Sequence, residues 1–403
     1  MKLGVVADDV TGAADLADAV CDAGWSAAVV FGVPAAPLPA ADCVVVALKS
    51  RTAPVAEAVA ESTAAARALL SGGAPRLYQK YCSTFDSTED GNIGPVADAL
   101  LDLLGASLSV GTPATPRSGR TVYQGHLFVG RQLLADSPMR DHPLTPMRDS
   151  DLVRVLGRQT PRPVTAARRG ELAGLDAPGH VLADALDDAD LDRLAVAVTA
   201  LQGPVLLGGA AGLAAALARA DTGGGRPRRP AFPSPAGAAP RLIVSGSCSQ
   251  RTQEQVTAFA GPVVPLAPAK LAADFDGAVE RALGSVRAAY DRGAPTVLVS
   301  STAAPGARGD VPAGTADRLE RAAGAIARAA VTDLGVRRLL VAGGETSGAV
   351  VRALGLVALR VGPPAGPGVP WLVPAEDDSL ALLLKSGNFG AVDLFTAAWE
   401  ACP

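Results

Sequence analysis

The chain has 403 residues, of which 49% are hydrophobic and 19% charged, a composition that excludes disorder and suffices for two domains. A formal net charge of −4 argues against a nucleic-acid partner held by bulk electrostatics. Five scattered cysteines without a CxxC pair, a first segment unlike a signal peptide and no long apolar run predict a cytoplasmic protein without a membrane partner or structural zinc.

Short β-branched strands repeatedly lead into a polar or Gly-rich turn and then into an Ala/Leu-rich helix. The predicted strands are residues 3–7, 43–48, 76–82, 121–129, 204–208, 241–246, 296–300, 337–343 and 358–362. Apolar strands that alternate with helices are typical of buried parallel sheets. We therefore predict an α/β protein with two Rossmann-like domains, mostly parallel sheets, and ligand sites in the interdomain cleft.

Residues 221–240 predict the linker between these domains. They contain four glycines and five prolines without any periodicity, which is typical of a connecting segment. The predicted domains are residues 1–230 and 236–403.

Asp8 and Asp9 follow the first predicted strand, in the stretch ADDVTG. Ligands of open parallel sheets bind beyond the carboxyl ends of the strands, where carboxylates can hold a metal, accept a substrate hydroxyl or act as a base. The alternative is a helix cap, in which Asp9 or Thr11 accepts first-turn amides. A haloacid-dehalogenase phosphatase does not fit, because its Asp-x-Asp nucleophile would need an aspartate at Val10.

Two further strand ends carry polar side chains. LKSRT (48–52) supplies Ser50 and Arg51, and arginine matches a carboxylate or phosphate through two parallel hydrogen bonds. YQKYCSTFDSTEDGNIG (78–94) supplies Lys80, Ser83, Thr84, Asp86, Ser87, Gly91 and Asn92. We expect the three strand ends to converge on one crevice for a polyhydroxylated anion, with Lys80 and Arg51 as candidates for its carboxylate.

Three Gly-rich turns lie in the second half of the chain: SGSCSQRT (245–252), GGETSG (343–348) and KSGNFG (385–390). The first two join a predicted strand to a helix, where small residues expose backbone amides to a phosphate. None is a Walker A loop or a GxGxxG motif. The third contains Lys385, one of five lysines against 31 arginines in the chain.

Together these motifs resemble the four-carbon acid sugar kinase family. The resemblance covers nearly the whole chain, in family order, through ADDVTGAADLA, LKSRT, KYCSTFDST-x-x-GNIG, DHPLTPMRDS, SGSCS-x-x-T-x-x-Q, GGETSG and LLLKSGNFG. Threonate and erythronate kinases of the family typically carry K-x-DSTLRGN. Residues 80–88 read KYCSTFDST instead, which is similar to the 3-oxo-tetronate branch.

The resemblance implies a sugar-acid-binding N-terminal domain, a nucleotide-binding C-terminal domain, and phosphorylation of a terminal hydroxyl with ATP and Mg²⁺. It implies ATP contacts at Ser245 or Ser247, with Ser247 preferred, and at Gly343, Gly344, Glu345, Thr346 and Gly387. The remaining site residues are interpreted as follows: Asp86 and Asp9 compete as the base, Lys80 lies near the transferring phosphate, and Asp8, Ser50, Arg51, Ser83, Thr84, Gly91 and Asn92 bind the sugar acid.

Two other functions stay open. One is a threonate or erythronate kinase of the same family, and the other is a non-catalytic protein that binds a sugar acid and a nucleotide. We expect a homodimer only because enzymes of this kind are often dimers.

Overall fold

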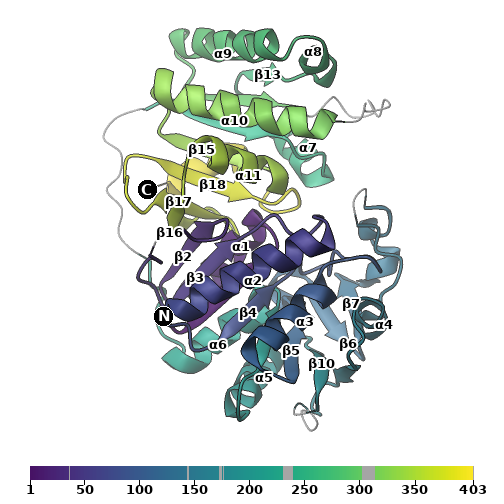
Figure 1. The fold of residues 1–403 in the computed structure, drawn as a ribbon. Coiled ribbons are helices and arrows are strands. Elements are labelled where there is room, and N and C mark those ends of the chain that lie inside the picture. The colour runs from purple at the N-terminus through teal and green to yellow at the C-terminus, as the bar shows by residue number, and fades with distance from the viewer. Residues whose placement is uncertain are drawn as a thin grey trace. The chain divides into compact units, whose positions relative to one another are not determined.

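The computed structural model describes residues 1–35, 37–142, 145–171, 175, 177–229, 239–301 and 314–402. The chain forms two compact units, Met1–Arg228 and Arg229–Pro403 (Figure 1). Each contains a mostly parallel sheet with helices packed on it, which confirms the predicted α/β fold class. Residues 221 and 222 belong to a helix and not to the predicted linker, and residues 230–238 of that linker lie outside the described part.

The first unit is built on a parallel sheet. Its described strands, in spatial order, are β2 (Ala27–Phe31), β3 (Cys43–Ala47), β1 (Leu3–Ala7), β4 (Leu77–Lys80), β11 (Leu206–Gly209), β5 (Leu108–Thr112), β10 (Gly179–Ala183) and β9 (Val164–Ala167). Most of their residues are buried, as expected when helices cover both faces of a parallel sheet.

The order of these strands places a crevice beside β1. Helix α1 (Val10–Asp22) connects β1 to β2 in one direction, and α2 (Val55–Ser71) connects β3 to β4 in the other. Because such crossovers are right-handed, the two helices cover opposite faces of the sheet. The chain therefore diverges at the carboxyl end of β1, where open α/β sheets bind their ligands.

The other helices of the first unit extend the two layers. α3 (Ile93–Leu104) packs beside α2, while α5 (Asp188–Ala200) and α6 (Ala211–Thr222) continue the row that begins with α1. A short α4 (Leu152–Gly157) packs against β9.

The single strand predicted for residues 121–129 is wrong. The structure forms an antiparallel sheet of β6 (Arg120–Tyr123), β7 (His126–Val129) and β8 (Gln132–Leu133). Gln124 and Gly125 both have positive φ, 50° and 75°, and make a two-residue hairpin turn. The carboxylate of Asp184 accepts their two backbone N–H groups at 2.7 and 2.9 Å, so a residue distant in sequence stabilises the turn.

The second unit also contains a series of hydrogen-bonded strands. Its described strands, in spatial order, are β13 (Val263–Pro265), β14 (Thr296–Ser300), β12 (Arg241–Ser245), β15 (Arg338–Ala342), β18 (Ala381–Lys385), β17 (Pro370–Pro374) and β16 (Ala358–Pro364). The first five are parallel, whereas β16, β17 and β18 form an antiparallel meander. The described helices are α7 (Gln250–Ala258), α8 (Pro268–Ala273), α9 (Phe275–Asp291), α10 (Thr315–Asp333), α11 (Gly344–Ala353) and α12 (Leu394–Ala397).

This sheet also diverges next to its central strand. After β12 the chain passes through α7 to β13, whereas after β14 it returns through α10 to β15 on the other side of β12. The turns that follow β12 and β15 therefore border a second crevice of the type that binds ligands.

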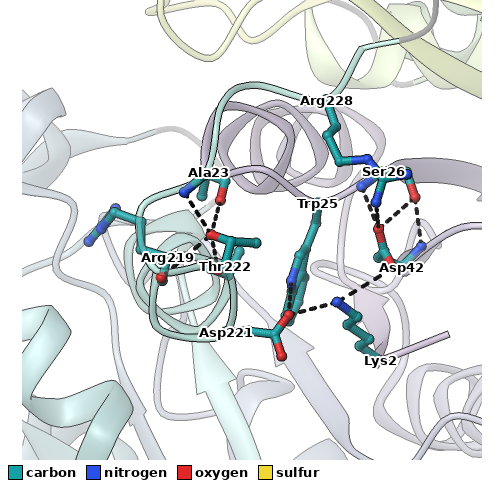
Figure 2. A network of polar contacts seen from close by, with 11 residues as sticks. Lys2, Ala23, Trp25, Ser26, Asp42, Arg219, Asp221, Thr222 and Arg228 are labelled. Carbon is teal, nitrogen blue, oxygen red and sulfur yellow. Dashed lines mark hydrogen bonds and ion pairs between the residues drawn. The ribbon is translucent and has the colours of Figure 1, made fainter.

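Polar contacts fasten the chain where it leaves the first unit (Figure 2). Asp221, at the end of α6, accepts hydrogen bonds from Trp25 Nε1 at 2.9 Å and from Lys2 Nζ at 2.7 Å. Asp42, just before β3, accepts from Arg228 Nη1 at 3.1 Å. These contacts hold the last segment of the unit at the amino-terminal edge of its sheet, away from the β1 crevice.

A buried histidine joins α3 to two strands. His180 Nε2 donates to Asp98 Oδ1 at 2.8 Å, which leaves Nδ1 to accept the Ser109 hydroxyl at 2.6 Å. Asp98 also accepts from Thr160 Oγ1 at 2.8 Å. Burial lowers the pKa of His180 although Asp98 opposes this effect, so folding favours the neutral ring.

We expect the free energy of unfolding to fall as the pH drops below about 6.5, because the unfolded chain then binds a proton that His180 in the folded state resists. His180→Gln should flatten this part of the pH profile and cost about 1–3 kcal/mol at neutral pH. Urea unfolding across pH 5–8 measures both effects. His126→Gln, outside this network, is the control, and equal slopes for the wild type and His180→Gln would contradict the assignment.

Candidate functional site

Three neighbouring strand ends bring the first group of predicted residues together. β1 lies between β3 and β4, so Asp8 and Asp9 lie between Arg51 on one side and Lys80 on the other. The backbone fixes this arrangement, because the Ser50 amide donates to the Asp8 carbonyl and the Asp8 amide donates to the Lys80 carbonyl, both at 3.1 Å.

Arg51 is at the centre of the cluster. Its Nε and Nη2 donate to the two oxygens of Asp8 at 2.9 Å each, Nη2 lies 3.0 Å from Asp9 Oδ1, and Nη1 lies 3.8 Å from Asp86 Oδ2. Burial opposes the charge, but Asp8 and Asp9 raise the pKa of Arg51 and keep it protonated. The guanidinium therefore organises three carboxylates, which argues against the prediction that it binds a substrate carboxylate.

The two adjacent aspartates have different environments. Asp9 caps α1, because Oδ1 accepts the Gly12 amide and Oδ2 accepts the Thr11 hydroxyl, both at 2.9 Å. Although burial opposes ionisation, Arg51 and Lys80 lower the pKa of Asp9. Burial instead raises the pKa of Asp8, against the effect of Arg51. Asp9 thus has the role of the helix cap that the sequence left open.

A pocket opens beside the cluster. Of the residues predicted from the sequence, it is lined by Asp8, Ser50, Arg51, Lys80, Asp86, Ser87 and Asn92. Asp9, Ser83, Thr84 and Gly91 do not line it. The remaining lining residues were not predicted: Gln79, Tyr81 and Ile93 lie within the stretch 78–94 but were not singled out, and Val6, Ser62 and Val96 belong to a strand or to helices without a polar motif.

A strained turn presents Asp86 to this pocket. Phe85 is fully buried with a φ of 51°, a conformation that bulky side chains rarely adopt. Its ring packs edge-on against Tyr81, with a centroid distance of 5.2 Å. The Thr84 hydroxyl donates to Asp86 Oδ1 at 2.5 Å, so Thr84 orients the carboxylate. Asp86 Oδ2 has a weaker contact, with Arg51 at 3.8 Å.

Asn92 closes another side of the pocket. Its Nδ2 donates to the carbonyls of Ser50 and Ala53 at 2.7 and 2.9 Å, which ties the start of α3 to the loop after β3. Its Oδ1 is buried without a hydrogen-bond partner among the described residues. This oxygen can therefore accept a hydroxyl of a bound ligand.

Gly91 and Gln159 shape the loop before α3. A Cβ at Gly91 would lie 1.9 Å from Ser87 Oγ, so the position requires glycine for close packing. Gln159 Nε2 donates to the same Ser87 Oγ at 2.8 Å. Gln159 has no sequence motif that could have revealed this role, because it follows α4 and lies far from the loop along the chain.

Three turns converge in the second unit, after the adjacent strands β12, β15 and β18. Ser247 lies between two of them: a Cβ on Gly387 would come within 2.5 Å of its hydroxyl, and one on Gly343 within 3.3 Å of its amide nitrogen. A Cβ on Gly246 would lie 2.1 Å from Thr346 Oγ1. The glycines thus permit close backbone packing at the amino ends of α7 and α11, where amides can bind a phosphate.

The other predicted nucleotide residues belong to the same region. Gly344 and Glu345 form the first turn of α11, next to Gly343, which has a φ of 123°. Ser245 is the last residue of β12, and its side chain is buried with a hydroxyl that has no partner among the described residues. Ser247 lies in the turn itself, next to Gly343 and Gly387, whereas Ser245 ends the strand before it.

The described residues show neither a preformed metal site nor a membrane span. They contain no group of three or more His, Cys, Asp or Glu side chains arranged to hold a metal ion. None of their helices has the length and apolar character needed to cross a membrane.

Comparison with known proteins matches both halves of the chain to domain families. Residues 3–217 match the family described as a sugar-binding N-terminal domain, and residues 242–395 match the nucleotide-binding C-terminal domain. A protein of Methylobacterium radiotolerans named 3-oxo-tetronate kinase is 47% identical, and 99% of each chain is covered. One of the same name from Burkholderia multivorans is 45% identical, covering 99% of this chain and 97% of that one.

Two solved structures have folds similar to that of this chain over nearly its full length. A Salmonella typhimurium protein, whose given name is that of a tRNA synthase, has a TM-score of 0.85 at 34% identity, with complete coverage of both chains. A Haemophilus influenzae protein has a TM-score of 0.76 at 36% identity, covering 98% of this chain and 99% of that one.

Gly12→Ala tests the packing around the Asp9 cap. The new methyl group would lie 2.2 Å from Asp9 Oδ1 and 2.9 Å from Lys80 Nζ, so it should displace the capping carboxylate and cost about 1–2 kcal/mol of unfolding free energy. Urea unfolding measures the change. Gly157→Ala, whose Cβ meets open space in the same unit, should leave stability unchanged within about 1 kcal/mol. Equal effects at both sites would refute this packing.

Proposed function

Because the chain belongs to the family that joins a sugar-binding N-terminal domain to a nucleotide-binding C-terminal domain, we propose that it is an ATP-dependent 3-oxo-tetronate kinase. The observation that carries the proposal is its full-length identity to relatives of that name. The reaction transfers the γ-phosphoryl group of ATP to the 4-hydroxyl of the four-carbon keto acid. The products are ADP and the 4-phosphate, and the proton of the hydroxyl is released.

In this proposal the pocket beside the Arg51 cluster binds the sugar acid. Lys80 Nζ donates one hydrogen bond, to the Tyr81 carbonyl at 2.9 Å, and a protonated lysine has two further donors for the substrate carboxylate. Arg51, already paired with aspartates, favours their ionised forms and fixes them in position. Asn92 Oδ1 accepts a substrate hydroxyl, and Ser50 provides a further polar contact in the pocket wall.

Asp86 is the proposed base. It lines the pocket, one of its oxygens is oriented by Thr84, and the other is 3.8 Å from Arg51. An incoming hydroxyl can therefore donate to Oδ2. Asp9, whose oxygens already accept from Gly12 and Thr11, is less suited to this role.

ATP binds at the three turns of the second unit in this proposal. The contacts are with Ser247, Gly343, Gly344, Glu345, Thr346 and Gly387, while Ser245 ends the strand that leads into the first turn. Phosphoryl transfer requires mainly positioning and charge neutralisation. The prediction that both ligands meet in an interdomain cleft stays a prediction, as does the homodimer.

Mg²⁺ fits the chemistry of these residues only as a partner of the nucleotide. The ion usually retains waters and is held by phosphates with one or two carboxylates, so the lack of an acidic cluster among the described residues is compatible with it. Glu345, in the first turn of α11, is the carboxylate that would hold it near ATP. When bound, the ion neutralises charge on the phosphates.

An acceptor panel tests the function. With MgATP, 3-dehydrotetronate should support ADP release, whereas threonate and erythronate should be at least tenfold poorer in kcat/KM, because the site lacks the K-x-DSTLRGN pattern of their kinases. A coupled ADP assay gives the rates. Equal turnover of all three acids would overturn the branch assignment, and no turnover would favour the non-catalytic binding protein.

Asp86→Asn tests the base. The amide cannot accept the proton, so kcat should fall by about 10²–10⁴-fold while the affinity for ATP is retained. Steady-state kinetics and calorimetric titration with ATP separate the two effects. Asp90→Asn, an exposed position four residues along the same loop, is the matched control and should keep full activity. Near-normal kcat in Asp86→Asn would remove Asp86 from the mechanism.

A further inference from the structure

Lys385 is a buried lysine to which the proposed reaction assigns no role. It is the last residue of β18, its side chain is fully buried, and it forms no ion pair with a carboxylate among the described residues. A buried charge of this kind is costly unless it is paired. Lys385 begins one predicted nucleotide turn and contacts Thr252 in another, which indicates that an anionic partner would bind at these turns.

The hydrogen bonds of Lys385 converge on one peptide group. Nζ donates to the Gly387 carbonyl at 3.1 Å and to Thr252 Oγ1 at 2.9 Å. The hydroxyls of Thr252 and Ser249 donate to the same carbonyl at 2.9 and 2.6 Å. Three donors from β18 and the start of α7 therefore hold the Gly387 carbonyl in a single orientation.

This orientation determines where the next amide points. The chain has no cis peptide bonds among the described residues, and in a trans peptide the C=O and the following N–H point in opposite directions. The Asn388 amide is thus directed away from Lys385, and it has no hydrogen-bond partner in the described part of the chain. A free amide on a Gly-rich turn beside the amino end of α7 is suited to an anion.

We propose that Lys385 is a positioning residue of the nucleotide site: it orients the Asn388 amide toward an ATP phosphate, and its ammonium group, on the opposite side of the same peptide, adds positive potential at that phosphate. This inference rests on the proposed function, because it requires that the second unit binds ATP. It explains why a lysine without a carboxylate partner occupies the interior of this unit.

Electrostatics adds a measurable consequence. Burial, assisted by Arg251, lowers the pKa of Lys385 to about 7. The helices around it carry further charged residues that do not contribute to this shift: Glu254 on α7, Glu345 and Arg352 on α11, and Asp393 before α12. A bound phosphate favours the ammonium form, so ATP binding near pH 8 should be accompanied by proton uptake.

Calorimetric titration with a non-hydrolysable ATP analogue and Mg²⁺ tests the proposal, at pH 7.5–9 and in buffers of different ionisation enthalpy. Wild-type affinity should fall as the pH rises, by up to about tenfold per pH unit, with proton uptake. Lys385→Met should bind about 10- to 100-fold more weakly at pH 7.5, with a flat pH profile and no uptake. Lys270→Met, which removes an exposed lysine of the same unit, should behave as the wild type.

The outcomes separate this inference from the proposed function. If the wild type binds the analogue without proton uptake, or if Lys385→Met is folded and retains wild-type affinity and pH dependence, the role of Lys385 is wrong while the kinase assignment stands. If the wild type does not bind the analogue, both fail. Urea unfolding verifies that Lys385→Met is folded, and the wild-type proton uptake decides the question even if that variant does not fold.

Discussion

The ion pairs of Arg51 are the interaction on which the first unit's site depends. One half-buried guanidinium contacts Asp8 and Asp9 closely and Asp86 at 3.8 Å, and these residues come from three separate segments. Buried carboxylates without such a partner would take up protons or repel one another. Because Arg51 pairs with them, the structure can bring a helix cap (Asp9), a carboxylate of raised pKa (Asp8) and a candidate base (Asp86) together around one side chain.

Both units place their candidate sites by the same rule. In each sheet the chain crosses to one side after the central strand and later returns to the other, and the turns that carry the functional side chains border the resulting crevice. The two crevices differ in chemistry. The first presents charged side chains, which suits a small polar acid, whereas the second presents backbone amides and hydroxyls, which suits phosphates.

The sequence predicted the fold class, fewer than half of the strands that the structure describes and the polar strand ends, because continuous apolar strands and Gly-rich turns are local signals. The sequence left two interpretations of Asp9 open, since a helix cap and a catalytic carboxylate require the same residue type at the same position. The sequence predicted one strand over residues 121–129, where the structure has β6 and β7, because Asp184, which stabilises the turn between them, is remote along the chain. Gln159 and Ser62 were missed for a related reason: only the tertiary structure brings them to the site.

The strained turn at Phe85 connects packing to substrate choice. A left-handed conformation at a bulky residue costs on the order of 1–3 kcal/mol, and here the fully buried ring and its contact with Tyr81 offset that cost. The backbone then turns so that Thr84 and Asp86 bond to each other and Asp86 reaches the pocket. The chain departs from K-x-DSTLRGN at this turn, so we infer that substrate preference within the family depends on where the turn places its aspartate as well as on which side chains line the pocket.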